Sequence, residues 1–251
     1  MLSDPNFYLA STIAIAIFGI SKGGFGGGLG IMAVPIMALA ISPSVAAAVM
    51  LPLLCLMDVI GIRAYWGVWD RHSLSVIIPG SIVGILLGTF AFGWLSENAV
   101  RLIVGVIALA FVLNHWRQRE EPPAREPNAA KGLFWGSVAG FTSTLAHAGG
   151  PPANIYFLPL KLDKAAFVGS MVVAFALINY LKLIPYLWLG LFTRDTLIAG
   201  LILAPVAGLS MLLGLFLHKR IDGVWFYRLC YLFLFLTGSK LIWDGLTGLH
   251  M

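Results

Sequence analysis

The stretch FGISKGGFGGGLGIMAVP, residues 18–35, decides the fold of this chain, because a run of glycines interrupts an apolar helix inside a hydrophobic region. A second stretch, AGFTSTLAHAGGPPANIYFLP at 139–159, has the same plan: an apolar piece, a glycine break, and a short piece containing a proline. Glycine allows a tight turn and a close approach of the backbone. The two breaks therefore predict two places where a helix stops within the apolar part of the molecule.

The composition indicates a bilayer protein. Of the 251 residues, 59% are hydrophobic and 11% are charged, and the mean hydropathy is +0.92. Soluble proteins have about a quarter charged residues, and a membrane-spanning helix needs about 20 mostly apolar residues. The net charge of +5 comes from basic residues scattered through short connectors, which excludes a nucleic-acid-binding patch. We therefore predict an all-α integral membrane protein whose partner is the lipid bilayer.

Glycine, proline and charged residues divide the chain into apolar segments. These lie near residues 7–20, 28–40, 44–64, 74–94, 98–116, 132–147, 152–160, 165–189, 195–217 and 225–246. The order of features repeats, and each half has a helix with a proline and a glycine at the same spacing, Pro79 and Gly88 or Pro205 and Gly214. An internal duplication is therefore predicted. The predicted domains are a first membrane repeat at 1–116, a cytoplasmic linker at 117–131 and a second membrane repeat at 132–251.

The first two pieces of each half decide the topology. The piece at 7–20 is about 21 Å long and the piece at 152–160 about 14 Å, both too short to span comfortably. Each pair is either a re-entrant hairpin or one broken helix that crosses once. The hairpin gathers eleven Lys and Arg on one face against three on the other, whereas the broken helix gives eight against six. The positive-inside rule thus favours hairpins, each followed by three spanning helices, so the two repeats have inverted topology and both termini lie outside.

A hairpin tip inside a membrane has backbone groups that hydrocarbon cannot satisfy, so it must be buried in protein or line a wet cavity. Helices that begin after Gly28 and at Pro151 would direct N–H groups and positive dipole ends at that depth, which favours an anion. The predicted substrate-binding residues are Ser21, Lys22, Gly23, Gly24, Gly26, Gly27, Gly28, Ser143, Thr144, His147, Gly149, Gly150, Pro151 and Asn154.

The ionisable residues of this region have two readings each. Lys22 is expected to help hold the anion, or else to pair with Asp58 or extend along the hairpin. His147 could relay a proton or donate to an oxyanion, or could be a hydrogen-bonded packing residue. Asp58, Asn179, which aligns with it, and Lys182 are predicted to serve in coupling or in charge pairing.

Nothing in the sequence predicts a metal, a cofactor or a catalytic residue. Cys55 and Cys230 lie in apolar segments without further ligands at metal-binding spacing, so we expect small buried hydrophobes. The GFGGG run lacks the strand and the acidic residue of a dinucleotide site, and no nucleophile elbow or HExxH occurs. The start, MLSDPNF, lacks the features of a signal peptide. We therefore expect that the protein is not an enzyme.

The two glycine breaks, each followed by a proline and about 124 residues apart, give the chain a resemblance to the sulfite exporter TauE/SafE family of bacterial membrane transporters. The resemblance covers essentially the whole chain, and His147 and Pro152 depart from the usual pattern. The family's motif residues fall on Gly23, Gly24, Gly26, Gly27, Gly28, Pro35, Gly149, Gly150, Pro151 and Pro159.

The resemblance implies a secondary transporter that exports a small sulfur-containing anion, sulfite or an organosulfonate such as sulfoacetate, across the inner membrane. A negative cell interior drives each unit charge outward by about 2.3 kcal/mol per 100 mV, so export needs no ATP-binding motif. We expect alternating access between the repeats. The alternatives are proton-coupled uptake of a small organic anion, an anion channel and a membrane-embedded enzyme that uses His147 and Asp58. A homodimer is left open.

Overall fold

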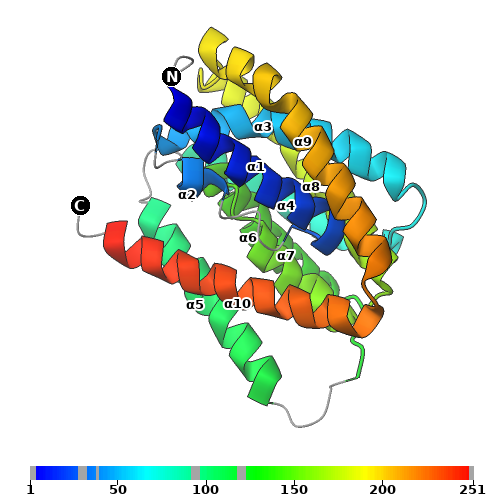
Figure 1. The fold of residues 1–251 in the computed structure, drawn as a ribbon. Coiled ribbons are helices and arrows are strands. Elements are labelled where there is room, and N and C mark those ends of the chain that lie inside the picture. Colours follow the sequence, from blue (N-terminus) through cyan, green and yellow to red (C-terminus); the bar gives the residue numbers. More distant parts are fainter. Residues whose placement is uncertain (1–3, 28–32, 38–39, 92–96, 118–122, 249–251) are drawn as a thin grey trace.

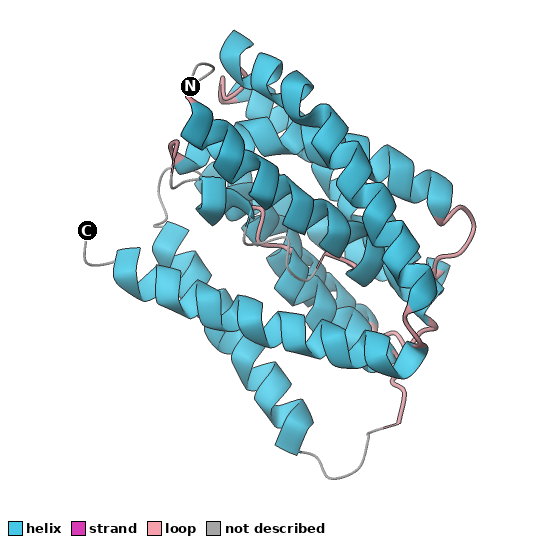
Figure 2. Ribbon diagram, viewed as in Figure 1, coloured by secondary structure: helices cyan, strands magenta, loops and turns pink. Residues whose placement is uncertain are grey.

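The computed structural model describes residues 4–27, 33–37, 40–91, 97–117 and 123–248, and within these ranges the chain forms helices and loops and no strand (Figures 1 and 2). The helices in chain order are α1 Pro5–Phe25, α2 Ala33–Met37, α3 Pro43–Ala64, α4 Arg71–Ala91, α5 Glu97–Arg117, α6 Ala129–Ala146, α7 Gly150–Phe157, α8 Lys164–Trp188, α9 Arg194–Arg220 and α10 Gly223–Gly248, with a short 3-10 helix, η2 Leu158–Leu160, after α7. The predicted all-α class is confirmed.

Six helices in the described part of the chain are long and apolar enough to cross a membrane: α1, α3, α4, α8, α9 and α10. Helix α5 was predicted as a span but is not among them, although it has 21 residues. Helix α1 also has 21 residues, about 31 Å, so the expectation that the first piece ends near residue 20 is wrong. Gly23 and Gly24 lie inside this helix rather than at its break.

The two helices that precede the breaks begin and end alike. The Asp4 side chain accepts a hydrogen bond from Asn6 N at the start of α1, and the Asn128 side chain accepts one from Lys131 N at the start of α6. Helix α1 ends at Gly26 and α6 ends at His147, both in the left-handed conformation, with φ of 66° and 50°. This conformation is the usual helix C-cap, and glycine adopts it without strain whereas histidine does not.

After each break the chain packs back against the helix it has just left. Helix α2 contacts α1, and α7 contacts α6. In Figure 1, α2 lies toward the end of the molecule at which α1 begins. Arg125 N donates to Pro159 O at 2.9 Å, so the chain just before α6 lies beside the chain just after α7. Both ends of the α6–α7 pair are therefore on the same side of the molecule.

The halves are joined crosswise by glycine-lined helix contacts. Helix α1 packs on α9 of the second half, and a Cβ on Gly23 would lie 2.5 Å from Met211 O. Helix α6 packs on α4 of the first half, where a Cβ on Gly84 would overlap Ser137 O. Small residues let two backbones approach closely, which is the main source of helix association in lipid. The first helix of each half is thus fixed by the other half.

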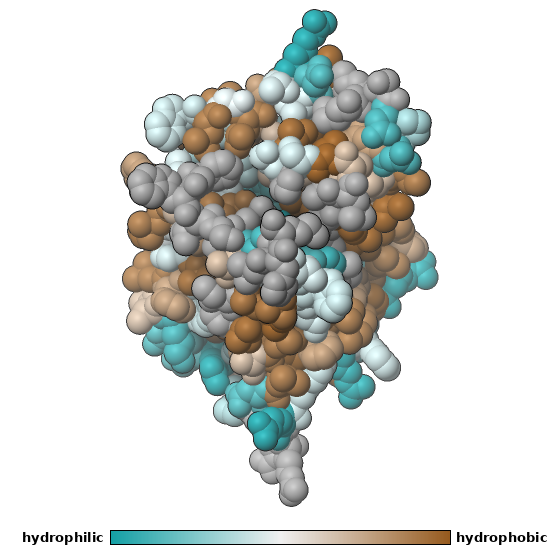
Figure 3. Space-filling view, turned by 90° about the vertical axis from the view of Figure 1, so that its left-hand side faces the viewer, coloured by the Kyte–Doolittle hydropathy of each residue, from teal (hydrophilic) through white to brown (hydrophobic). Residues whose placement is uncertain are grey.

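The outer surface is strongly apolar. Leu201, Phe90 and Leu209 are about 70% exposed or more. Figure 3 views the side on which both termini lie, and apolar residues cover much of its visible surface. Trp66 and Trp188 are also exposed, each just at or beyond a helix end, as an aromatic belt at a membrane boundary requires. Such an apolar surface is typical of a protein that contacts lipid.

Candidate functional site

A group of buried polar side chains lies where the ends of α1 and α6 approach α3 and α8. We call it the central polar cluster: Lys22, Asp58, Ser143, His147, Asn179 and Lys182. Each is 6% exposed or less. Burying so many polar groups is costly unless each has partners, so the hydrogen bonds among them define the site.

Lys22 and Asp58 form a buried ion pair. Lys22 Nζ on α1 lies 2.8 Å from Asp58 Oδ1 on α3. Asn179 Nδ2 on α8 donates to Asp58 Oδ2 at 2.7 Å, and the Phe175 ring lies 5.6 Å from the Lys22 ammonium. Of the two readings of Lys22, the structure contains the pairing with Asp58. Each oxygen of the Asp58 carboxylate thus has a partner, Lys22 of α1 for one and Asn179 of α8 for the other.

Lys182 has only neutral partners in the described part of the chain. Its Nζ lies 3.2 Å from Ser143 O, 2.9 Å from Ser143 Oγ and 2.9 Å from His147 Nδ1, and no described carboxylate is within 4.0 Å. Because the Ala47 carbonyl oxygen can only accept, His147 Nε2 donates to it at 3.2 Å, and Nδ1 of the neutral ring is then the acceptor for Lys182. One interpretation of the sequence was that Lys182 pairs with Asp58, and the described residues do not contain this pair.

A small cavity lies within the cluster. It has a volume of about 20 Å³ and is lined by Phe18, Lys22, Gly27, Leu54, Ser143, His147, Gly150, Phe175 and Asn179. Such a volume holds about one water molecule. An oxyanion of sulfur therefore enters only if the surrounding helices move apart.

The carbonyl groups at both helix ends are satisfied by tyrosines. Tyr65 OH donates to Gly23 O at 2.8 Å, and Tyr186 OH donates to Thr144 O at 3.2 Å. His218 Nδ1 donates to Gly24 O at 3.0 Å. Buried helix ends need such partners, because water does not reach them.

The hydrogen bonds of the two tips correspond residue by residue. Gly27 N donates to Ser21 O in the first half, and Ala148 N donates to Thr142 O in the second. The separation of the two sites is 121 positions, which is also the separation of Asp58 from Asn179 and of Tyr65 from Tyr186. At the same spacing Lys22 corresponds to Ser143 and Gly26 to His147.

Not every predicted residue reaches the cavity. Gly23 and Gly24 face α9, where a Cβ would meet Met211 O and Gly214 O. Thr144 Oγ1 donates to Gly140 O in its own helix. Asn154 Nδ2 donates to Gly150 O, while its Oδ1 is buried without a partner. Ser21, Gly26, Gly149 and Pro151 are buried near the tips and do not line the cavity, and Gly28 lies outside the described residues.

The start of α7 offers fewer N–H groups than a helix start usually does. Pro151 and Pro152 have no N–H, and Ala153 N donates to Gly149 O at 3.2 Å. The first turn therefore contributes a dipole end and at most the N–H groups of Gly149 and Gly150.

Three lining residues were not predicted: Phe18, Leu54 and Phe175. Each precedes a predicted polar residue, Lys22, Asp58 or Asn179, by four positions. Residues four apart lie on the same face of a helix, so this spacing could have identified them. Tyr65 and Tyr186 were also missed, and the correspondence of the two halves was the available signal.

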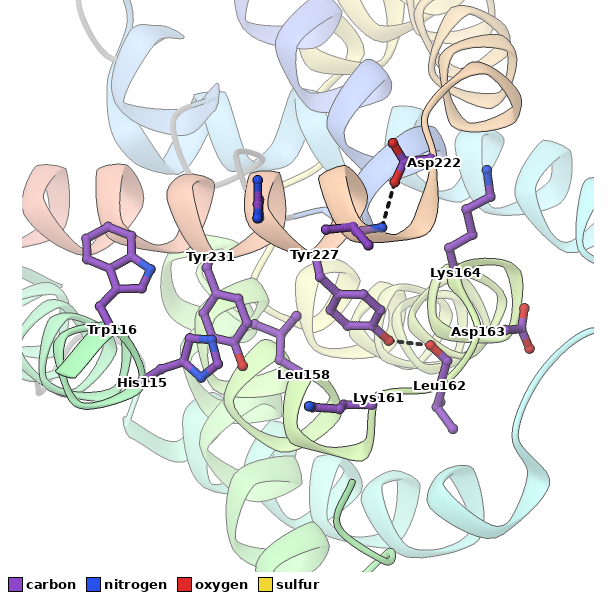
Figure 4. Close-up of a pocket in the computed structure, with 12 residues that line it drawn as sticks. His115, Trp116, Leu158, Lys161, Leu162, Asp163, Lys164, Asp222, Tyr227 and Tyr231 are labelled. Carbon is purple, nitrogen blue, oxygen red and sulfur yellow. Dashed lines mark hydrogen bonds between the residues drawn. The ribbon is translucent and has the colours of Figure 1, made fainter. Parts of the chain in front are cut away.

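A larger pocket of about 890 Å³ opens among the connectors near α10 (Figure 4). Lys161, Lys164 and Arg228 line it together with Tyr227 and Tyr231. Figure 4 shows Tyr227 extending from α10 to Leu162 O, to which its hydroxyl donates. We call this the basic pocket, and it contains none of the residues predicted for the site.

The two aspartates of the basic pocket are bound to backbone. Asp163 Oδ1 accepts from Ala165 N and Ala166 N, and Asp222 Oδ1 accepts from Val224 N and Trp225 N. They cap the starts of α8 and α10. Among the described residues, no group of three His, Cys, Asp or Glu side chains could hold a metal ion, at this pocket or elsewhere.

The family model for the sulfite exporter TauE/SafE family matches residues 11–241, nearly the whole chain. The chain belongs to this family. TauE/SafE proteins are transmembrane transporters, in agreement with the apolar helices of the fold. No curated protein and no solved structure gave a match. The predicted family is therefore confirmed, and the site is interpreted below as that of a transporter.

Proposed function

We propose that this TauE/SafE protein is a secondary transporter that exports a small sulfur-containing anion, sulfite or an organosulfonate, across the inner membrane by alternating access. The observation that carries this proposal is the Lys182 side chain, which is fully buried, has neutral partners among the described residues and lies next to residues that line the small central cavity. A buried charge within a membrane protein usually marks a substrate or ion pathway.

The two halves act as inverted repeats in this proposal, each beginning with a re-entrant hairpin. The matching hydrogen bonds at the two tips support it. The packing of α1 on α9 and of α6 on α4 supports it too. If α1 corresponds to α6 and α4 to α9, a two-fold axis between the halves converts one of these contacts into the other. Binding near the repeat interface is common among secondary transporters.

The orientation follows from the connectors that lie together on one side. Lys164 Nζ donates to Ile221 O and His218 O, which brings the start of α8 to the end of α9. Asp70 N donates to Ser170 Oγ, which brings the start of α4 to the same place. This side holds most of the basic residues counted above, so we assign it to the cytoplasm and both termini to the outside. Alkaline phosphatase fused after residue 251 would be active in this orientation and inactive in the opposite one.

The basic pocket is the proposed approach from the cytoplasm. Its Tyr227 ring lies 5.8 Å from Phe167, and a Cβ on Gly26 would lie 2.9 Å from the Phe167 ring. Gly27, the next residue, lines the central cavity. A layer formed by Phe167 therefore separates the pocket from the cavity, and rocking of one half against the other would move it.

The test is counterflow of labelled sulfite in proteoliposomes of the purified protein. A carrier exchanges labelled for unlabelled anion, and the replacement Lys182→Met should remove this exchange. Lys131→Met, at an exposed lysine in the first turn of α6, is the matched control and should exchange normally. Absence of sulfite flux, or fast flux without counterflow, would reject the carrier proposal.

A further inference from the structure

We propose that the central polar cluster carries a single uncompensated positive charge and therefore selects singly charged anions over doubly charged ones. The inference rests on the proposed function and refines its substrate class. It is derived from the charges of the cluster and from the positions of their partners.

The charges of the cluster can be counted among its described residues. Lys22 and Asp58 cancel each other across 2.8 Å. Asn179 occupies the position in the second half that Asp58 occupies in the first, so a neutral amide stands where a second carboxylate would balance Lys182. His147 is neutral, because its Nδ1 accepts from Lys182 and its Nε2 donates to Ala47 O.

In this proposal Lys182 is an ammonium, and its contacts match that state. Three acceptors, Ser143 O, Ser143 Oγ and His147 Nδ1, match the three N–H bonds of a protonated lysine. The side chain is 0% exposed, so water does not screen its charge. A buried charge without a counter-ion is strongly unfavourable. An anion that supplies the counter-ion is therefore bound in preference to a neutral molecule.

The cavity is the place for that counter-ion. Ser143 and His147, which hold Lys182, line it, and Lys22 and Asn179 line its other side. One negative charge here brings the cluster to neutrality. A second negative charge would be buried without a partner, next to the Asp58 carboxylate. The cluster thus rejects a dianion for the same reason that it binds a monoanion.

The test uses sulfonates whose charge is independent of pH near neutrality. Methanesulfonate is the monoanion, and ethane-1,2-disulfonate and sulfoacetate are the dianions. Counterflow and thermal stabilisation are both measured on the full-length protein. The wild type should exchange methanesulfonate at least tenfold faster than either dianion and should be stabilised by it alone.

Asp58→Asn raises the net charge by one without changing the size of the side chain. This variant should lower the preference for the monoanion by at least tenfold, and should be stabilised by ethane-1,2-disulfonate. Asp244→Asn, at the Lys240–Asp244 pair of α10, is the matched control and should keep the wild-type ratio. An unchanged ratio in folded Asp58→Asn, or a wild type that exchanges both classes equally, overturns the proposal.

A further pair of variants keeps the test decisive if Asp58→Asn does not fold. The double variant Lys22→Met with Asp58→Asn leaves the net charge unchanged, so its preference for the monoanion should persist whatever its rate. Lys182→Gln brings the net charge to zero, and stabilisation by methanesulfonate should disappear. The opposite result in either variant rejects the charge count. If the wild type exchanges sulfite but shows no charge preference, only the inference fails, whereas a wild type that neither exchanges nor binds any of these anions overturns the proposed function as well.

Discussion

The tip of α1 and the tip of α6 end their helices in the same backbone conformation but with different side chains. The first has Gly26 at the left-handed position and Lys22 one turn earlier, paired to a carboxylate on α3. The second has His147 and Ser143 at these positions, and its lysine is on α8. In the charge count proposed above, the first tip is electrically neutral and the second lies beside the positive charge of Lys182. Equivalent backbones thus have different side chains, and we propose that one half stabilises the site while the other attracts the substrate.

The largest expected effect is a loss of stability at the first tip, where Lys22 pairs with Asp58. Lys22→Met leaves Asp58 buried and unpaired, which should lower the free energy of unfolding by about 3–5 kcal/mol. The double variant Lys22→Met with Asp58→Asn should cost clearly less than the sum of the single changes. Denaturant titration of the purified protein in detergent measures both. Additive costs would show that the two side chains do not interact.

The second largest effect is expected at Lys182, the charged residue beside the second tip. Lys182→Met removes the uncompensated ammonium and should reduce sulfite exchange by about 100-fold or more, equivalent to about 2.7 kcal/mol at 1.36 kcal/mol per factor of ten. Its stability should rise or stay constant, because an unpaired buried charge has been removed. Exchange rates and unfolding of the same preparation test this. Loss of stability together with exchange would assign Lys182 a structural role instead.

A smaller effect concerns the helix that supports the second tip. Gly84→Ala places a methyl group against Ser137 O of α6, which should cost about 1–3 kcal/mol by overpacking. In Gly208→Ala on α9, the nearest atom is Ile60 Cδ1 at 3.9 Å, so this control should be neutral. Thermal unfolding in detergent compares them. Equal behaviour of the two variants would disprove the close contact of α4 with α6.

The smallest effect tests whether the tips are equivalent. Tyr65→Phe and Tyr186→Phe each remove one hydrogen bond to a carbonyl at a helix end, which should cost about 1 kcal/mol. The Tyr65 change should cost more, because its bond is 2.8 Å rather than 3.2 Å. Tyr180→Phe, at a residue that is 40% exposed and whose hydroxyl donates to Cys55 O at 3.3 Å, is the comparison and should cost less than either. A clear loss at only one of the two tips would show that they are not equivalent in stability.

Hydropathy predicted the helices well but misjudged the first break. Glycine at 23 and 24 reads as an interruption in sequence, yet both residues are helical and allow α9 to pack closely. A sequence does not distinguish a glycine that ends a helix from one that faces a neighbouring backbone, because both need the absence of a side chain. The true end is set by Gly26, which is left-handed.

The sequence predicted which residues belong to the site better than it predicted which of them contact one another. Lys22, Ser143 and His147 meet at one cavity, as the two breaks indicated, and Asn179, which was predicted for coupling or charge pairing, lines it as well. Whether Asp58 pairs with Lys22 or with Lys182 depends on how α1, α3 and α8 are placed relative to one another. That placement is set by the glycine contacts between the halves, which a single sequence leaves unspecified.

The crosswise packing also has a consequence for biosynthesis. Ser210 Oγ donates to Ile15 O across 195 positions of sequence, so α1 leaves the ribosome long before the helix it packs against. At 5–20 residues per second this delay is roughly 10–40 s. During that time the glycine face of α1 is without its final neighbour in the bilayer, whereas Lys22 meets its partner Asp58 within the first half. The first half is therefore complete in its ion pair but incomplete in its helix packing until the second half arrives.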